Sequence, residues 1–118
     1  MKENVLKEKS FGFALRVVNL FQYLQKKKKE FVMSKQLLRA GTAVGAMVRE
    51  AEFAESRSDF THKMSIALKE INETLYWLEL LNASNYLSTR QFESIHRDAT
   101  EIIRLLASTV KTAKTASQ

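Results

Sequence analysis

Apolar residues recur at helical spacing in four stretches of the chain, and none of these shows the two-residue alternation of a half-buried strand. The spacing predicts helices over about residues 10–25, 31–55, 58–83 and 88–112. Short connections between amphipathic helices are typical of antiparallel neighbours in a bundle. The sequence therefore predicts an all-α fold, an antiparallel up-down-up-down four-helix bundle that spans residues 1–118 as one domain.

Two of the predicted helix starts carry capping signals. Ser56 and Ser58 precede the third helix, and either can place a hydroxyl at its N-cap. Ser88 and Gln91 have the spacing of a capping box, in which both side chains satisfy free backbone N–H groups. These signals predict sharp starts for the third and fourth helices.

The first predicted helix is apolar over more of its circumference than one packing contact needs. Phe11, Phe13, Leu15 and Leu20 widen its stripe to an arc of roughly 220°, against the ~100° of a surface helix. The helix is either central in its bundle or buries a second face against another subunit. Because 118 residues offer little interior, we favour the second interpretation and predict Phe13 and Leu20 at an oligomer interface.

Two glycines, Gly41 and Gly45, lie four residues apart inside the second predicted helix. A phosphate-binding loop would need a preceding strand and a Gly-Lys-Ser/Thr ending, which are missing here. A membrane helix-pairing motif would need an apolar span, but Arg39 and Arg49 bracket only nine uncharged residues. Each glycine costs an isolated helix about 0.8–1 kcal/mol relative to alanine, so a contact must compensate. We predict a packing notch where another helix approaches closely.

The residue types argue against catalysis and metal binding. The chain has no cysteine, which excludes disulfides and thiolate chemistry and fits a cytoplasmic protein, and no stretch is apolar enough for a membrane span. Glu93 and His96 have the Glu-x-x-His spacing of di-metal bundles, and Asp59 and His62 lie near the third helix start. Antiparallel neighbours place these two pairs at opposite ends. We therefore expect no enzyme, no metal site, no cofactor and no membrane partner.

Charged residues on the second and third helices are spaced for ion pairs between neighbouring helices. Three of them could transfer protons if buried, but ion pairing is the usual role of such residues. The residues that we expect in inter-helix ion pairs are Arg39, Glu50, Lys69, Glu70 and Glu73.

The net charge of +6 is concentrated in residues 1–30, which carry eight basic and three acidic side chains. A basic excess favours anionic partners, nucleic acid foremost, although it also serves solubility. Four adjacent lysines, Lys26 to Lys29, cannot be buried, and they form either a phosphate-attracting site or a solvated turn.

Four cations of the fourth predicted helix recur every seven residues and so form one stripe: Arg90, Arg97, Arg104 and Lys111. Such a ridge could lie along a phosphate backbone. Glu93 and Glu101 stand three or four residues from two of these arginines, which predicts a ladder of pairs that largely neutralises the stripe.

Two stretches, SKQLLRAGTAVGAMVREAEFAESRSDFTHKMSIALKE and INETLYWLELL, resemble the bacterial four-helix-bundle family named after the 23S rRNA intervening sequence. The shared motifs are Leu38-Arg39-Ala40, Glu50, Ser58-Asp59-Phe60, and Glu73 with Tyr76 to Glu79. Many relatives have Asn-Ile-Ala-Glu where this chain has Met47-Val48-Arg49-Glu50, so any polar role of that asparagine is lost.

The resemblance implies a bundle that assembles into a ring-like homopentamer. The chain is also similar to the accessory proteins of diversity-generating retroelements, which are basic pentamers that bind a reverse transcriptase and nucleic acid. We therefore expect a self-assembling bundle that presents basic surface to RNA or DNA, or alternatively a protein-interaction scaffold whose charge serves solubility. The candidate nucleic-acid contacts are Lys26, Lys27, Lys28, Lys29, Arg90, Arg97, Arg104 and Lys111.

Overall fold

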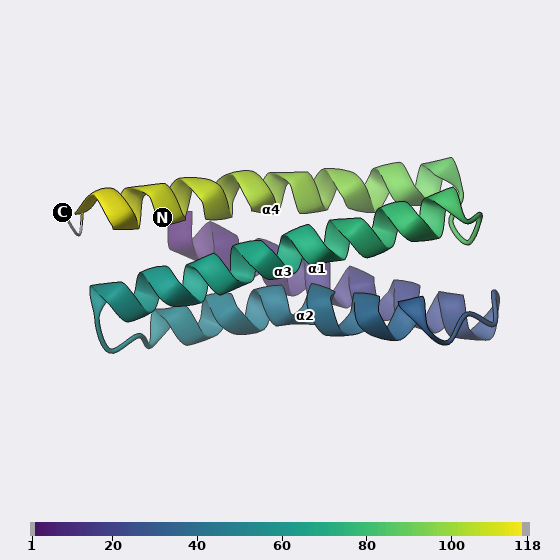
Figure 1. Ribbon diagram of the computed structural model, residues 1–118, viewed down its shortest axis with the longest axis horizontal. Helices are drawn as coiled ribbons and strands as arrows, with labels where there is room; N and C mark the ends of the chain where they lie inside the picture. The colour runs from purple at the N-terminus through teal and green to yellow at the C-terminus, as the bar shows by residue number, and fades with distance from the viewer. Residues whose placement is uncertain (1, 117–118) are drawn as a thin grey trace.

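The computed structural model describes residues 2–116 and confirms an all-α four-helix bundle. The helices are α1 (Lys2–Lys26), α2 (Met33–Glu52), α3 (Arg57–Ala83) and α4 (Thr89–Ala116). Each runs antiparallel to the one before it, so both chain ends lie at the same end of the bundle (Figure 1). The α1–α2 and α3–α4 connections lie together at the opposite end.

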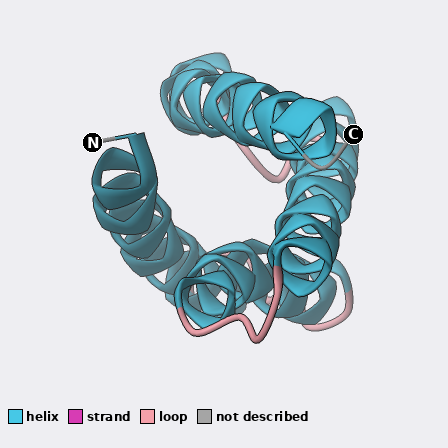
Figure 2. Cartoon of the chain, turned by 90° about the vertical axis from the view of Figure 1, so that its left-hand side faces the viewer, coloured by secondary structure: helices cyan, strands magenta, loops and turns pink. Residues whose placement is uncertain are grey.

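The four helices surround a common centre, as the view along the bundle shows (Figure 2). Helices that are adjacent in sequence pack extensively, while α1 and α4 close the ring with the weakest contact. The largest fully buried side chains come from every helix: Leu6, Phe13, Val17, Leu24, Leu37, Val44, Met64, Ile71, Leu78, Leu81, Ile102 and Leu106.

Helix α1 begins at Lys2, well before the predicted start near residue 10. The extension is held because Leu6 is fully buried and because Lys7 and Lys9 pair with carboxylates of other helices. Helix α4 likewise continues to Ala116, whose carbonyl oxygen accepts a hydrogen bond from Arg57 Nη1 at 3.1 Å.

The predicted capping box forms at the start of α4. Ser88 N–H donates to Gln91 Oε1 at 2.9 Å, and Gln91 N–H donates to Ser88 Oγ at 3.1 Å. At the start of α3 the N-cap is Ser56, whose hydroxyl oxygen accepts from the backbone N–H of Asp59 at 3.0 Å. Local sequence therefore fixes both helix starts.

A buried glutamate, Glu30, organises the turn between α1 and α2. Its backbone N–H donates to Leu24 O at 2.9 Å, which folds the lysine run back over the end of α1. Its carboxylate accepts the backbone N–H groups of Val32, Met33 and Ser34 at 3.2, 3.0 and 2.7 Å. Burial raises the pKa of Glu30, but these N–H donors outweigh it and hold the pKa below the ordinary value. The N-terminus of α2 is thus already occupied by an anionic group.

Candidate nucleic-acid interface

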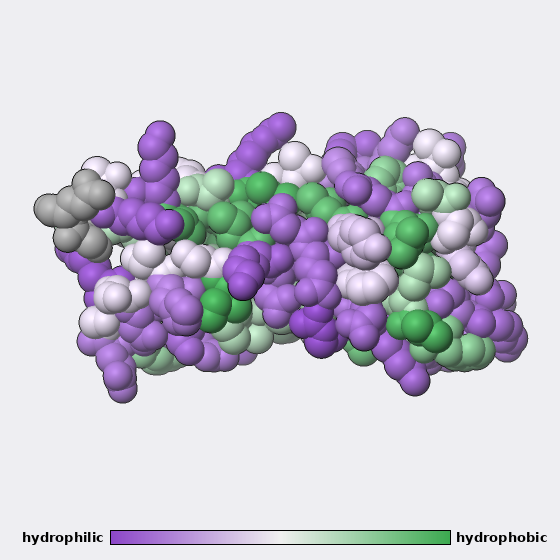
Figure 3. Space-filling view, viewed as in Figure 1, coloured by the Kyte–Doolittle hydropathy of each residue, from purple (hydrophilic) through white to green (hydrophobic). Residues whose placement is uncertain are grey.

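The four cations predicted as one stripe lie along the outermost face of α4. Arg90, Arg97, Arg104 and Lys111 are all exposed, and hydrophilic side chains stand out from the edge of the molecule formed by α4 (Figure 3). At seven-residue spacing, successive cations are about 10.5 Å apart along the helix axis. We call these four residues the α4 row.

The predicted ladder of neutralising pairs does not form within α4. Glu101 Oε1 instead accepts Lys9 Nζ of α1 at 2.7 Å, and this contact raises the pKa of Lys9. Among the described side chains, those of residues 4–116, no carboxylate lies within 4.0 Å of a member of the α4 row. The row is therefore a line of exposed cations without fixed counter-charges.

The contact between α1 and α4 is largely polar. Arg16 Nη1 lies 2.6 Å from Asp98 Oδ2 and donates to Ser94 O at 3.2 Å, while Arg16 Nη2 donates to Ser94 Oγ at 2.9 Å. The acidic side chains of α4 that face α1, Asp98 and Glu101, are both engaged there. Cations of α1 thereby engage both carboxylates, including Glu101, which lies on the same exposed face of α4 as the row.

The lysine run is exposed at the end of the bundle where α4 begins, so Lys26 to Lys29 share that end with Arg90. The structure adds Lys35, exposed in the first turn of α2 at the same end. Sequence reasoning missed it because a lone lysine on an amphipathic helix carries no distinguishing pattern. Basic side chains thus occupy one end of the bundle and continue along α4.

An ion-pair cluster joins α2 to α3. Arg39 Nη1 lies 3.4 Å from Glu70 Oε1, and Arg39 Nη2 contacts Glu73, which also accepts the indole N–H of Trp77 at 3.0 Å. The Trp77 hydrogen bond and the Arg39 guanidinium together lower the pKa of Glu73. Nearer the other end, Lys63 Nζ pairs with Glu50 Oε1 at 3.1 Å.

Lys69 requires a correction. It was expected in an inter-helix ion pair, but it is exposed and has no carboxylate within 4.0 Å in the part of the chain that the structure describes. Its heptad position explains this, because Lys69 lies on the outer side of α3, away from the buried Ala67 and Ile71.

Both glycines lie against α1. A Cβ atom on Gly41 would stand 2.8 Å from each methyl carbon of Val17, and one on Gly45 would stand 3.3 Å from the backbone oxygen of Ser10. The missing side chains are thus what permits the close approach of α1 and α2.

The predicted interface residue Phe13 requires a second correction. Its side chain is 2% exposed and belongs to the core, and Leu20 is half-buried against the same core. The stripe continues back to Leu6, and the seven-residue spacing from Leu6 to Phe13 to Leu20 directs all three inward.

The exposed apolar side chains of α1 are instead Phe11 and Leu15, at 54% and 53% exposure. Arg49 of α2 places its guanidinium carbon 5.8 Å from the centre of the Phe11 ring. Both apolar residues belong to the wide arc seen in the sequence. Because the predicted helix began after Leu6, the sequence did not show which residues of the arc, Phe13 or Phe11 and Leu15, face the core.

His96, one of the two histidines weighed as metal ligands in the sequence, contacts side chains of its own helix. His96 stacks at a tilt against Phe92 and its Nδ1 lies 3.4 Å from Thr100 Oγ1. Among the side chains that the structure describes, those of residues 4–116, no three histidines or carboxylates come close enough together to hold a metal ion. None of the described helices combines the length and apolar character needed to cross a membrane.

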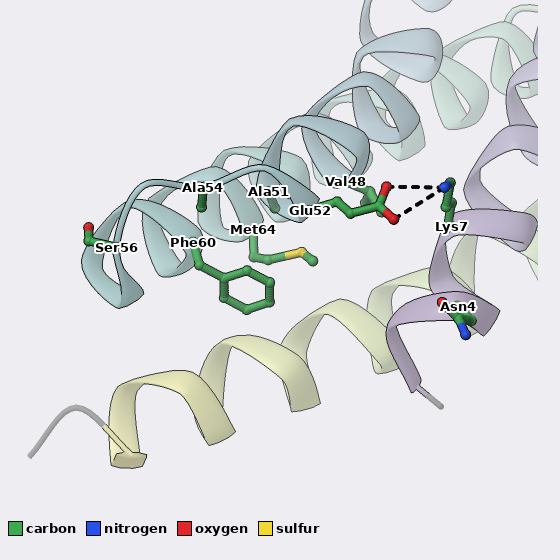
Figure 4. A pocket seen from close by; sticks show the side chains of 9 residues that line it. All are labelled: Asn4, Lys7, Val48, Ala51, Glu52, Ala54, Ser56, Phe60 and Met64. Atoms are coloured by element: carbon green, nitrogen blue, oxygen red, sulfur yellow. Dashed lines mark hydrogen bonds and ion pairs between the residues drawn. The ribbon is translucent and has the colours of Figure 1, made fainter.

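A hollow of about 500 Å³ opens at the end of the bundle that holds the chain termini. Val48, Phe60 and Met64 supply its apolar wall, and Lys7 pairs with Glu52 at 3.0 Å beside them (Figure 4). This ion pair is exposed, so it lacks the burial that prepares a general acid or base.

Comparison with known proteins finds a family and a similar solved structure. A family model described as 23S rRNA-intervening sequence protein matches residues 2–108. A crystal structure from Bacteroides thetaiotaomicron, of a protein with unknown function from the S23 ribosomal protein family, is similar at 58% identity and a TM-score of 0.93. The match covers 94% of this chain and 99% of that one. No curated protein matches the chain.

Proposed function

Since the chain belongs to the 23S rRNA-intervening sequence protein family, we propose that it is a non-enzymatic, cytoplasmic protein that self-associates and binds RNA or DNA through its basic surface. The observation that carries this proposal is the α4 row, four exposed cations without a fixed carboxylate partner. Unpaired cations retain their field in solvent and can neutralise phosphates.

The distribution of carboxylates supports the same function. Glu50, Glu70, Glu73, Asp98 and Glu101 all pair with cations of a neighbouring helix, so much of the acidic charge is held in seams between helices. The lysine run and the α4 row remain outside these pairs. These eight cations therefore lie on surface that a polyanion can reach.

Self-association strengthens such binding. Phe11 and Leu15 together place two large apolar side chains on the outer side of α1, where a second copy can bury them. We propose a homopentamer as the assembly. Joining several subunits converts weak phosphate contacts into avidity, since each further contact becomes intramolecular.

The assembly is tested by Phe11→Glu and Leu15→Glu. We expect each charge to be incompatible with a buried interface, so that the solution mass falls toward the 13.6 kDa of one chain while helix content is kept. Light scattering coupled to size exclusion measures the mass of the wild type and of each variant. The control is Phe53→Glu, a 78% exposed side chain in the α2–α3 connection, which should leave the mass unchanged. A wild-type mass of 13.6 kDa would contradict self-association.

Nucleic-acid binding is tested by retention of labelled RNA and DNA on filters at low salt. We expect binding that weakens steeply as salt rises, and a further loss when Lys26 to Lys29 are all replaced by glutamine, because the released counterions set the affinity. No salt-dependent retention of either polymer would instead favour the protein-interaction scaffold, with the charge serving solubility.

A further inference from the structure

The α4 row follows one rigid helix, shifting by about 20° around it with each step of seven residues, and spans much of the bundle. Arg90 and Lys111 are 21 residues apart on one continuous helix, which corresponds to about 31 Å along its axis. The bundle itself is 48 Å long. A rigid row of this length suits a partner that is also rigid over about 31 Å.

The surface beside the row offers nothing on which a base can stack. The neighbouring exposed residues of α4, Glu93, Glu101, Ala107 and Ser108, are acidic or small, while Phe92 is half-buried against the core. The exposed aromatic side chains lie on other elements: Phe11, Phe31, Phe53 and Tyr76. Proteins that bind single strands combine a basic groove with aromatic side chains under successive bases. The row supplies only the charges.

The same surface is poorly equipped to read bases. The exposed side chains of α4 include no asparagine or glutamine. The bundle measures 21 × 20 Å across its long axis. A major groove of about 12 Å admits a single helix, but α4 is flanked by α1 and α3 and cannot enter without them. Contact is thereby limited to the phosphates at the groove edges.

We infer that the α4 row binds the phosphate backbone of a nucleic-acid duplex, without reading its sequence and in preference to a single strand. The inference rests on the proposed function and names its substrate class. A duplex is a stiff rod whose turn of about 34–36 Å matches the row in length. The planar guanidinium groups of Arg90, Arg97 and Arg104 suit paired contacts to phosphate oxygens.

The experiment compares four labelled probes by fluorescence anisotropy over a salt series: a DNA duplex and an RNA duplex of about 24 base pairs, roughly two turns, and one strand of each. We expect both duplexes to bind about tenfold more tightly than the single strands, for unrelated sequences alike. The two duplex arms show whether DNA or RNA is preferred, since both present the same phosphate chemistry.

The row is tested directly by the double variant Arg97→Gln with Arg104→Gln. We expect the slope of log affinity against log salt to become shallower by about 1.8 per engaged subunit, since each lost phosphate contact contributes about 0.9. The matched control is Lys69→Gln, which removes an exposed, unpaired cation from the outer side of α3 and should leave the slope unchanged.

The outcomes separate the two proposals. Equal or tighter binding of single strands, or a duplex slope that the double variant does not change, overturns the inference while nucleic-acid binding stands. Failure of all four probes to bind at low salt overturns both. The α4 row is supported as the site if duplexes bind more tightly than single strands and if the salt slope becomes shallower in the double variant but not in Lys69→Gln.

Discussion

Replacing Gly41 by leucine is expected to lower the free energy of unfolding by about 3 kcal/mol, the upper part of the usual range for overpacking. The new Cβ would stand 2.8 Å from both methyl carbons of Val17, which is fully buried and β-branched and so cannot rotate away cheaply. Helices α1 and α2 must then separate. Thermal unfolding followed by circular dichroism should show a melting temperature lower by roughly 10 °C.

Two glycines of the same chain provide controls. Nothing lies within 4 Å of a Cβ built on Gly12, so Gly12→Ala should stabilise by about 0.8–1 kcal/mol through helix propensity alone. Gly45→Leu also meets α1, at the backbone of Ser10, and should destabilise too. Adding Val17→Ala to Gly41→Ala should cost less than the two single changes summed. Unchanged melting and unchanged mass in Gly41→Leu would contradict the packing notch.

The features that were predictable are those that depend on residues close in sequence. Helical periodicity gave four helices, and the Ser88–Gln91 spacing gave the capping box. The contact at Gly41 was also open to prediction, because a glycine inside a helix is costly unless another element approaches it.

The predictions that failed depend on which helices become neighbours. Phe13 and Phe11 are two residues apart in one broad apolar arc, and only the burial of Leu6 directs Phe13 into the core and leaves Phe11 outside. The start of α1 was missed for a related reason, because the charged residues around Leu6 hide the continuation of the stripe.

The charge on α4 shows the same limit. Glu101 has arginines three and four residues away, yet it pairs with Lys9. Exposed ion pairs are each worth under about 1 kcal/mol, so small differences in tertiary geometry decide between such partners. Sequence reasoning therefore identified the cations of the row but predicted the wrong partner for the carboxylate, and only the fold shows that the row is left unpaired.

The second large effect is expected from Glu30, where alanine should lower the free energy of unfolding by about 2 kcal/mol. The substitution leaves three backbone N–H groups at the start of α2 without their carboxylate acceptor, those of Val32, Met33 and Ser34. Urea unfolding at pH 7 measures the loss. Glu79→Ala is the control, since this exposed glutamate has no ion pair among the described residues and its removal should change stability by less than about 0.5 kcal/mol.

The contribution of Glu30 should also depend on pH, with a sign that follows from its pKa. Because the folded protein holds the pKa of Glu30 below the ordinary value of 4.5, the ionised carboxylate stabilises the fold at neutral pH. That stability is fully present above the ordinary pKa and is lost as the pH falls through the folded pKa. The difference in unfolding free energy between the wild type and Glu30→Gln should therefore be larger at pH 7 than at about pH 3. A difference that stays constant, or grows in acid, would show that the three N–H donors do not depend on the charge of Glu30.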